Sequence, residues 1–331
     1  MQFPGQGRPP AGVVFDCDMG NSIDDALALA LLYGLEGKNE ARLVSISVSK
    51  PNLNAAAFCE AVGRFYAGPV SGAFGAVGRT LPVGLALKGP NPEDTPMLME
   101  PLKKKNAEGA PAYNHGIRKT TDTAETPALI RNALTAQFDQ NAMVVLVGPA
   151  TNLVQVLDLP GCKDLITRKV RYLSVMGGAY PDGPPEYNVK QDIAAARKLF
   201  AEWPTPIVAS GVEVGDKILY PGASIEKDFT WTTDHPVVDA YRAYKKMPYD
   251  TPTWDLTSVL YAVRPKEGYF KLSEPGTIRV SEDGRTKFTP QADGKHRYLI
   301  HDPEQTERIV KAYVELISAK PVPRVRRRPS P

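Results

Sequence analysis

Short apolar runs alternate with longer helical patterns over the first two thirds of the chain. Runs rich in β-branched and other apolar residues predict strands at 12–16, 42–48, 69–74, 143–147, 170–176 and 206–210. Segments with helical spacing predict helices at 23–36, 54–66, 126–139, 152–157 and 192–202. Repeated strand–helix units with strands apolar on both faces predict an α/β fold with a mainly parallel central sheet flanked by helices.

The pattern changes after residue 211. Helices are predicted at 236–246, 256–262 and 303–317, and a small C-terminal β meander at 277–280, 287–289 and 296–300. Residues 77–121 are rich in Pro, Gly and Lys, which predicts an insertion or lid over the sheet. We therefore expect a single domain over 12–319, between a flexible N-terminal tail at 1–11 and a basic C-terminal tail at 320–331.

Composition and charge exclude several classes of protein. The 331 residues are 42% hydrophobic and 23% charged, as in ordinary globular proteins long enough to bury a large core. The net charge is +3, but the tail at 320–331 carries five cations and no acid, which leaves −2 for the remainder. A domain with that net charge lacks the excess of basic residues that nucleic-acid binding requires, so we expect no nucleic-acid partner.

Membrane and disulfide signals are also missing from the sequence. No stretch of about 18 apolar residues predicts a membrane span, so we expect no membrane partner. Residues 1–11 lack the apolar core of a signal peptide, which predicts a cytoplasmic protein unless a leader has been removed. Cys17, Cys59 and Cys162 are odd in number and lack metal-type spacing, so we expect buried free thiols.

The most informative segment is an acidic run that begins where the first predicted strand ends. Asp16 and Asp18 precede a turn at Gly20, and Asp24 and Asp25 open the next helix. Ser22 is a suitable N-cap for that helix, with Asp25 in a capping-box-like position. Helix-dipole complementation alone accounts for the two later acids but not for Asp16 and Asp18. Four converging carboxylates require a cation, or a cationic substrate, among them.

Five motifs in order resemble the inosine-uridine-preferring nucleoside hydrolase superfamily. They are the acidic run, Ser45-Ile46-Ser47-Val48-Ser49-Lys50-Pro51-Asn52, Gly148-Pro149-Ala150-Thr151-Asn152, Met176-Gly177-Gly178-Ala179-Tyr180 followed by Glu186-Tyr187-Asn188, and Trp254-Asp255. The resemblance covers most of the chain and implies a nucleoside-hydrolase-like fold with a Rossmann-like core. It also implies a small-molecule nucleoside or riboside substrate and a homodimer or homotetramer.

The resemblance implies a calcium-dependent N-ribohydrolase. Ca²⁺ is expected on Asp18, Asp25, Asp255 and the main-chain carbonyl of Val147, which agrees with the preference of this ion for oxygen ligands. Asp18 is expected to take a proton from the attacking water, which the metal makes easier to deprotonate. Side chains that hold the ribose are implied at Asp24, Asn52, Met176, Glu186 and Asn188. Asp16 is expected to orient the site from behind the ligands.

Departures from the family pattern concern the leaving group. Trp254 stands where many members have a His that protonates the departing base, and a Trp can stack on a ring but cannot act as an acid. His115 resembles another active-site His of the family and is the candidate proton donor. Further base-side candidates are Tyr187, Tyr249 and Trp231. The turn at Asn21-Ser22 is longer than is usual in the family.

Other interpretations stay open at this stage. Asp16-Cys17-Asp18-Met19-Gly20 superficially resembles the motif of haloacid-dehalogenase-type phosphatases, with Asp16 as nucleophile and Mg²⁺ as the ion. A second alternative is a catalytically altered homologue that binds ribose or nucleosides without turnover. Individual residues also have plain structural explanations, because Asn52 can be a turn residue and Asp255 a helix cap.

Overall fold

A computed structural model describes residues 9–68 and 80–322 of the chain. Within them, one ten-stranded sheet has the order β11-β10-β12-β6-β5-β4-β1-β2-β3, and β9 pairs with β12. The strands are β1 (Ala11–Cys17), β2 (Ala41–Val48), β3 (Val83–Leu85), β4 (Ala142–Leu146), β5 (Val170–Met176), β6 (Ile207–Ser210), β9 (Lys271–Leu272), β10 (Gly276–Val280), β11 (Thr286–Pro290) and β12 (His296–Ile300). A separate pair joins β7 (Leu219–Tyr220) to β8 (Thr251–Pro252).

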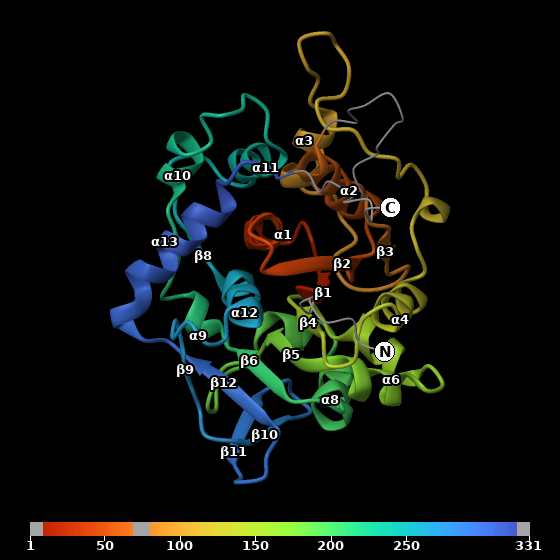
Figure 1. The fold of residues 1–331 in the computed structure, drawn as a ribbon, viewed down its shortest axis with the longest axis vertical. Helices are drawn as coiled ribbons and strands as arrows, with labels where there is room; N and C mark the ends of the chain where they lie inside the picture. Colours follow the sequence, from red (N-terminus) through yellow and green to blue (C-terminus); the bar gives the residue numbers. More distant parts are fainter. Residues whose placement is uncertain (1–8, 69–79, 323–331) are drawn as a thin grey trace, which may run out of the picture.

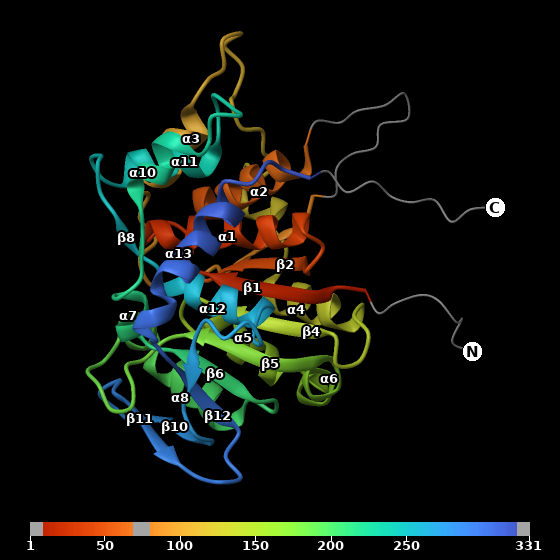
Figure 2. The same ribbon diagram turned by 60° about the vertical axis from the view of Figure 1, so that its left-hand side comes forward.

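The centre of the sheet is parallel. β1 lies between β2 and β4, and the parallel pairing continues through β5 and β6 to β12. Figure 2 shows β2, β1, β4 and β5 side by side. The C-terminal strands are antiparallel, but they extend the central sheet instead of forming a separate meander, because β12 adds to β6 and β10 lies between β11 and β12.

Helices cover both faces of this sheet. They are α1 (Ile23–Gly37), α2 (Leu53–Ala67), α3 (Pro96–Lys103), α4 (Thr126–Thr135), α5 (Thr151–Asp158), α6 (Cys162–Lys169), α7 (Tyr187–Gln191), α8 (Ile193–Glu202), α9 (Val212–Gly215), α10 (Gly222–Lys227), α11 (Pro236–Tyr244), α12 (Trp254–Val263) and α13 (Thr306–Ile317). Figure 1 shows α9, α12 and α13 on one side of the sheet and α4, α6 and α8 on the other. The predicted α/β class with a mainly parallel sheet is confirmed.

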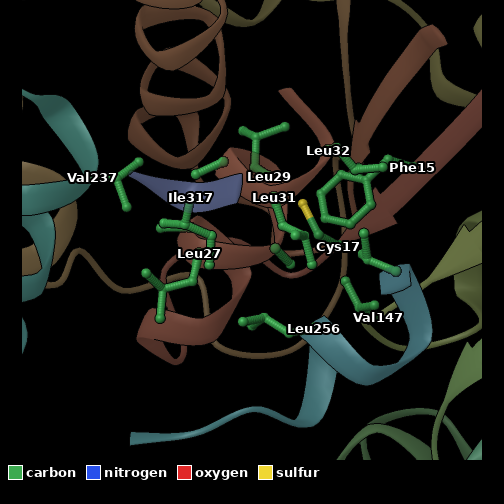
Figure 3. Close-up of a cluster of buried hydrophobic side chains, with 14 of the residues drawn as sticks. Phe15, Cys17, Leu27, Leu29, Leu31, Leu32, Val147, Val237, Leu256 and Ile317 are labelled. Carbon is green, nitrogen blue, oxygen red and sulfur yellow. The ribbon is translucent and has the colours of Figure 1, made fainter. Parts of the chain in front are cut away.

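Two hydrophobic clusters, one on each face, hold the layers together. Val13, Phe15 and Cys17 of β1 point to the face of α1, whereas Val14 points to the opposite face. This alternation is the two-residue period of a strand buried on both sides. α1 contacts α11, α12 and α13 as well as β2, so it is buried all round. Figure 3 shows its leucines packed with Phe15, Cys17 and Leu256.

Several predicted boundaries differ from those observed. The helix predicted over 126–139 ends at Thr135, because the chain turns back at Phe138 to enter β4. The helix predicted over 303–317 begins as a 3₁₀ turn, Pro303–Gln305. The strand predicted at 69–74 lies outside the described residues. Residues 80–122 contain the edge strand β3, α3 and a 3₁₀ turn, Thr120–Asp122.

The predicted tails fall mostly outside the described residues. Residues 1–8 and 323–331 are not described, and β1 already begins at Ala11. The three cysteines are buried and free, as expected. A bilayer-spanning helix is not found in residues 9–68 and 80–322, since each helix there is too short or too polar.

Candidate active site

Five carboxylates meet at the carboxyl end of the parallel strands. Asp16 and Asp18 lie at the end of β1, Asp24 and Asp25 begin α1, and Asp255 begins α12. All five side chains are buried, and none is more than 5% exposed. The backbone N–H of Asp255 donates to Asp24 Oδ2 over 3.1 Å, which joins the starts of two helices that are far apart in sequence. The long-range pairing expected of Asp255 is therefore present in the fold.

Burial of so many acids shifts their proton equilibria strongly. Burial raises the pKa of Asp18 to about 7, and repulsion from Asp24 adds to this while a hydrogen bond from Asn21 opposes it. Burial likewise raises the pKa of Asp24 to about 6. The pKa values of Asp25 and Asp255 are raised by burial and by repulsion from neighbouring carboxylates. The cluster is therefore costly to ionise without a compensating positive charge.

Asp25 carries the clearest sign that such a charge belongs in the site. Both of its carboxylate oxygens are buried without a hydrogen bond of ordinary geometry from the described part of the chain, and the backbone N–H of Ser22 only partly opposes the rise of its pKa. A buried carboxylate without partners is expensive unless it coordinates a cation. With Asp18, Asp255 and the Val147 carbonyl nearby in the fold, the donors are all oxygens, which is the set that Ca²⁺ or Mg²⁺ prefers.

The carboxylates are not arranged as a closed protein-only ligand shell. In residues 9–68 and 80–322, no three His, Cys, Asp or Glu side chains converge tightly enough to coordinate one ion on their own. Occupancy would therefore need rotation of these side chains, with carbonyl, water or substrate oxygens completing the coordination. The chemistry of the donors fits a hard divalent cation.

Ser22 does not cap α1 in the predicted way. It is the N-cap residue, but its side chain makes no capping hydrogen bond. Its hydroxyl instead donates to Asp24 Oδ1. The side chain thus bonds to the carboxylate cluster and not to the backbone of the helix.

A cavity of about 570 Å³ opens beside the cluster. Its lining includes the carboxylates of Asp18, Asp24, Asp255 and Glu186, together with Asn188 and Val147. The rest of the lining is largely apolar or aromatic: Met176, Pro184, Pro185, Tyr187, Val212 and Trp254, with Asn21, Ser22 and Lys190. A cavity lined by both carboxylates and aromatic rings suits a sugar joined to a flat heterocycle.

Glu186 and Asn188 form a rigid wall of the cavity. Glu186 caps α7 and accepts hydrogen bonds from the backbone N–H groups of Gly178, Asn188 and Val189. Asn188 Nδ2 donates over 3.3 Å to the carbonyls of both Val147 and Met176. The Met-Gly-Gly and Glu-Tyr-Asn motifs are therefore joined in space.

Gly148 allows the turn after β4 to approach the end of β1. A Cβ atom added at Gly148 would lie 2.8 Å from the Asp18 nitrogen and 2.8 Å from Ser49 Oγ. Since such contacts are shorter than real Cβ atoms show, only glycine fits without displacement of Asp18. The Gly-Pro turn is thus part of what positions the acidic run.

Asp16 lies behind the cavity and not on its surface. Its Oδ2 accepts from the Ser47 hydroxyl and from Asn152 Nδ2, the latter over 2.9 Å. It is fully buried, burial raises its pKa to about 7, and it does not line the cavity. This place suits the predicted orienting role and removes Asp16 from reach of a substrate, which argues against a phosphatase that uses it as a nucleophile.

Four predicted site residues do not line the cavity: Asp16 and Asp25, which are fully buried, and Asn52 and His115. Asn52 caps α2 by accepting from the Ala55 N–H, and its amide donates to the Pro92 carbonyl and to Asp94. The Nδ1 atom of His115 lies 2.9 Å from the Ile117 carbonyl, and its Nε2 atom lies 2.7 Å from an Arg118 nitrogen. Neither residue is among those that line the cavity. In this structure, Asn52 is a structural cap and His115 a loop residue.

Of the four aromatic candidates, two line the cavity and two do not. Trp254 lines the cavity, and its indole N–H donates to Asp216 Oδ1 over 2.8 Å, which fixes the ring. Tyr187 also lines the cavity, and its hydroxyl accepts from Asn91 Nδ2 over 2.7 Å. Tyr249 donates to the Tyr241 carbonyl and Trp231 to the Ser318 carbonyl, both outside the cavity.

Lys50 and Lys190 are site residues that the motif comparison did not single out. Lys50 is only 2% exposed and its Nζ donates to Asn21 Oδ1 over 2.9 Å. A lysine directly after the buried strand β2 is the sequence signal that could have drawn attention to it. Lys190 lines the cavity from α7, two residues after Asn188.

Comparison with known proteins defines the class to which this fold and site belong. The family described as "Inosine-uridine preferring nucleoside hydrolase" matches residues 13–316. The chain therefore belongs to the nucleoside hydrolase family, and its enzyme class is that of N-glycosyl hydrolases. No curated protein matches the chain in sequence.

Solved structures share the fold at low sequence identity. A purine-preferring ribonucleoside hydrolase from Gardnerella vaginalis is 18% identical, with a TM-score of 0.67 over 93% of this chain and 98% of that one. A plant nucleoside hydrolase, PpNRh1, is 19% identical (TM-score 0.62, 94% and 100% covered). An inosine-uridine preferring nucleoside hydrolase from Bacillus anthracis is 17% identical (TM-score 0.62, 93% and 99% covered).

Proposed function

We propose that the protein hydrolyses the N-glycosidic bond of ribonucleosides, or of a closely related N-riboside, in a Ca²⁺-dependent reaction. The observation that supports this most directly is the position of Asp18, Asp24 and Asp255, which line one cavity together with Trp254 and Tyr187. When bound, the ion would neutralise the acids, orient ribose hydroxyls and make a water molecule easier to deprotonate. The residues expected to hold it are Asp18, Asp25, Asp255 and the Val147 carbonyl.

Asp18 is proposed as the base that takes the proton from the attacking water. Asp18 is buried and lines the cavity, and the bound ion would keep its carboxylate ionised, as a base requires. Its Oδ2 accepts from Asn21 Nδ2 over 2.6 Å, so the carboxylate has a fixed orientation. Water then attacks the anomeric carbon while the bond to the base breaks, through an oxocarbenium-like transition state.

The sugar is proposed to bind between Asp24 and the pair formed by Glu186 and Asn188. These side chains are buried, so their hydrogen bonds to hydroxyl groups would be strong and their positions are fixed before substrate binds. Met176 contributes an apolar contact in the same wall. The base is proposed to lie against Trp254 and Tyr187, whose rings can stack on a heterocycle.

The test is hydrolysis of a panel of ribonucleosides and a p-nitrophenyl riboside, followed by quantification of the released base or nitrophenol. We expect release in Ca²⁺ and its loss after chelation. Asp18→Asn should lower kcat by about 10²–10⁴-fold, the usual contribution of a general base. Asp228→Asn, at an exposed position of the surface, is the matched control. Absence of release from every substrate, or release indifferent to both chelator and Asp18→Asn, would overturn the proposal.

A catalytically altered binder is the second candidate, and the position of Trp254 favours it. Among the cavity-lining residues, Tyr187 and Lys190 are the only side chains besides the carboxylates that can carry a proton to the departing base. If neither does so, poor leaving groups would bind without turnover. Nucleoside binding by calorimetry without base release, together with turnover of the activated p-nitrophenyl riboside, distinguishes this outcome. The homodimer or homotetramer implied by the resemblance stays a prediction for analytical ultracentrifugation.

A further inference from the structure

Lys50 is a buried cation close to the carboxylate cluster. It follows β2, and it is among the largest fully buried side chains of the described chain. Its Nζ donates to Asn21 Oδ1 over 2.9 Å, and Asn21 Nδ2 donates to Asp18 Oδ2 over 2.6 Å. Lysine, amide and carboxylate thus form one continuous chain that ends on the proposed base.

The charges around Lys50 come from two parts of the fold. Asp18 and Asp25 belong to the acidic run, and Glu93 and Asp94 belong to the segment before α3. Burial lowers the pKa of Lys50, and these four carboxylates oppose that shift. Asn21 is the one hydrogen-bond partner of the Lys50 ammonium in the described ranges. A lysine is seldom buried unless it is paired, so its place beside an acidic cluster calls for an explanation.

The Asn21 bridge explains the longer turn between Gly20 and α1. The Asn21 amide is bonded on both ends, so its orientation is fixed by Lys50 and in turn fixes Asp18. Asn21 and Asp18 both line the cavity, whereas Lys50 does not. Lys50 therefore acts behind the site, through another residue.

We propose that Lys50 is a positioning residue of the active site, which holds Asp18 through Asn21 and offsets part of the negative charge that attracts the metal ion. This role rests on the function proposed above. Two effects follow, and they have opposite signs. Loss of the ammonium leaves the cluster more negative, so Ca²⁺ binds more tightly. Loss of the fixed Asn21 leaves Asp18 less well oriented, so turnover falls.

The experiment compares Lys50→Met, Lys50→Arg and Asn21→Ala with the unsubstituted protein. Ca²⁺ affinity is measured by calorimetry on chelator-treated protein, and kcat and KM on the best nucleoside or riboside. Lys50→Met should bind Ca²⁺ about tenfold more tightly and lose about 10- to 100-fold in kcat with a smaller change in KM. Lys50→Arg retains the charge and should keep the original affinity. Lys227→Met, at an exposed lysine, is the matched control for both measurements.

The double variant Lys50→Met/Asn21→Ala tests whether the two residues act as one unit. If they do, its kcat is close to that of the worse single variant instead of the product of both losses. Additive losses, or Ca²⁺ affinity in Lys50→Met that is unchanged or weaker, would overturn the proposal. If Lys50→Met does not fold, Lys50→Gln and Asn21→Ala decide the outcome by the same measures.

Failure here is distinguishable from failure of the proposed function. If the unsubstituted protein binds Ca²⁺ but hydrolyses no substrate, the affinity comparison still decides whether Lys50 offsets the charge of the cluster. If the protein hydrolyses nucleosides and Lys50→Met leaves Ca²⁺ affinity unchanged, the role of Lys50 is wrong while the function stands. If the protein binds no divalent ion at all, both proposals are wrong.

Discussion

The side-chain amide of Asn188 donates a 3.3 Å hydrogen bond to the main-chain carbonyl of Val147. This bond joins the wall proposed to hold the sugar to the carbonyl proposed to hold the ion. Because it uses one lone pair of the carbonyl oxygen, the other remains for a ligand. The two halves of the proposed site are therefore coupled through a single amide.

Replacement of that amide should affect both substrate and ion. In Asn188→Ala, the Val147 carbonyl loses its anchor and the sugar loses the Asn188 Oδ1 acceptor, so we expect kcat/KM to fall by about 10- to 100-fold. Steady-state kinetics at several Ca²⁺ concentrations would separate the two contributions. Asn132→Ala, on the exposed side of α4, should change neither constant. Unaltered kinetics in Asn188→Ala would contradict a role for this amide.

Asp255 should be needed for the ion and not merely for helix capping. Its Ala variant removes one carboxylate from the cluster, and we expect Ca²⁺ affinity to fall on the order of 100-fold. Asp255→Asn keeps the shape of the side chain but loses the charge, so its Ca²⁺ affinity should be nearly as low as that of Asp255→Ala. If Asp255→Asn binds Ca²⁺ normally, Asp255 serves only to begin α12.

Substitution of Trp254 should change the kinetics, whereas substitution of His115 should not. Trp254→Ala removes a ring from the cavity wall, and we expect KM to rise about tenfold for nucleosides with a large base. His115→Ala, outside the cavity, should keep kcat within about twofold because its ring contacts only loop groups. Trp231→Phe is a matched aromatic control away from the cavity. A large loss of kcat in His115→Ala would restore His115 as the proton donor.

The carboxylate cluster should make the metal-free protein less stable as the pH rises. The pKa values of Asp16 and Asp18 are raised from 3.8 to about 7 in the folded protein, so the folded state binds more protons than the unfolded state at intermediate pH. The stabilisation is complete below the unfolded pKa and is lost as the pH rises through about 7. In chelator, we expect Tm to fall by about 3 °C or more between about pH 6.5 and about pH 8.

Calcium should reverse this trend, because it favours the ionised acids. The increase in Tm on adding Ca²⁺ should therefore be larger at the higher pH. His235 gives the opposite slope at lower pH, since burial lowers its pKa to about 3, and for that reason the window begins near pH 6.5. Differential scanning calorimetry measures both effects. A Tm in chelator that is flat or rises over this window would mean that the acids are not strained in the metal-free protein.

Gly148→Ala should disturb the end of β1 through steric contact alone. The added Cβ meets the Asp18 nitrogen and Ser49 Oγ, so we expect a loss of about 1–3 kcal/mol in the free energy of unfolding and weaker Ca²⁺ binding. Gly37→Ala is the control, because its Cβ would meet only Val322 at ordinary distance, with an expected change within about 1 kcal/mol. Equal stability of the two variants would mean that the turn can relax without displacing Asp18.

Local patterns predicted most of the elements that position the site. The strand that contains Asp16 and the helix after Ser22 depend on the local sequence pattern. The ends of both elements were predicted to within one residue. The buried free state of the three cysteines was predicted on the same grounds. Such features depend on the hydrophobic period and on composition, and both can be read from a single sequence.

Features that depend on distant segments were predicted less well. Asn52 looked like a substrate ligand because nothing nearby revealed Pro92 and Asp94, which occupy its amide. His115 looked like a proton donor because its loop could not be placed relative to the cavity. The parallel insertion of β12 beside β6 likewise depends on pairing between remote strands, which short-range patterns do not specify.

The placement of α12 has a consequence for biosynthesis. Asp255 lies 231 residues after Asp24, to which its backbone N–H donates, so the growing chain must extend past α12 before the carboxylate cluster can form. Prematurely terminated products would carry the motif at the N-terminus but no working centre. The proposed activity would therefore appear only in chains that extend past α12.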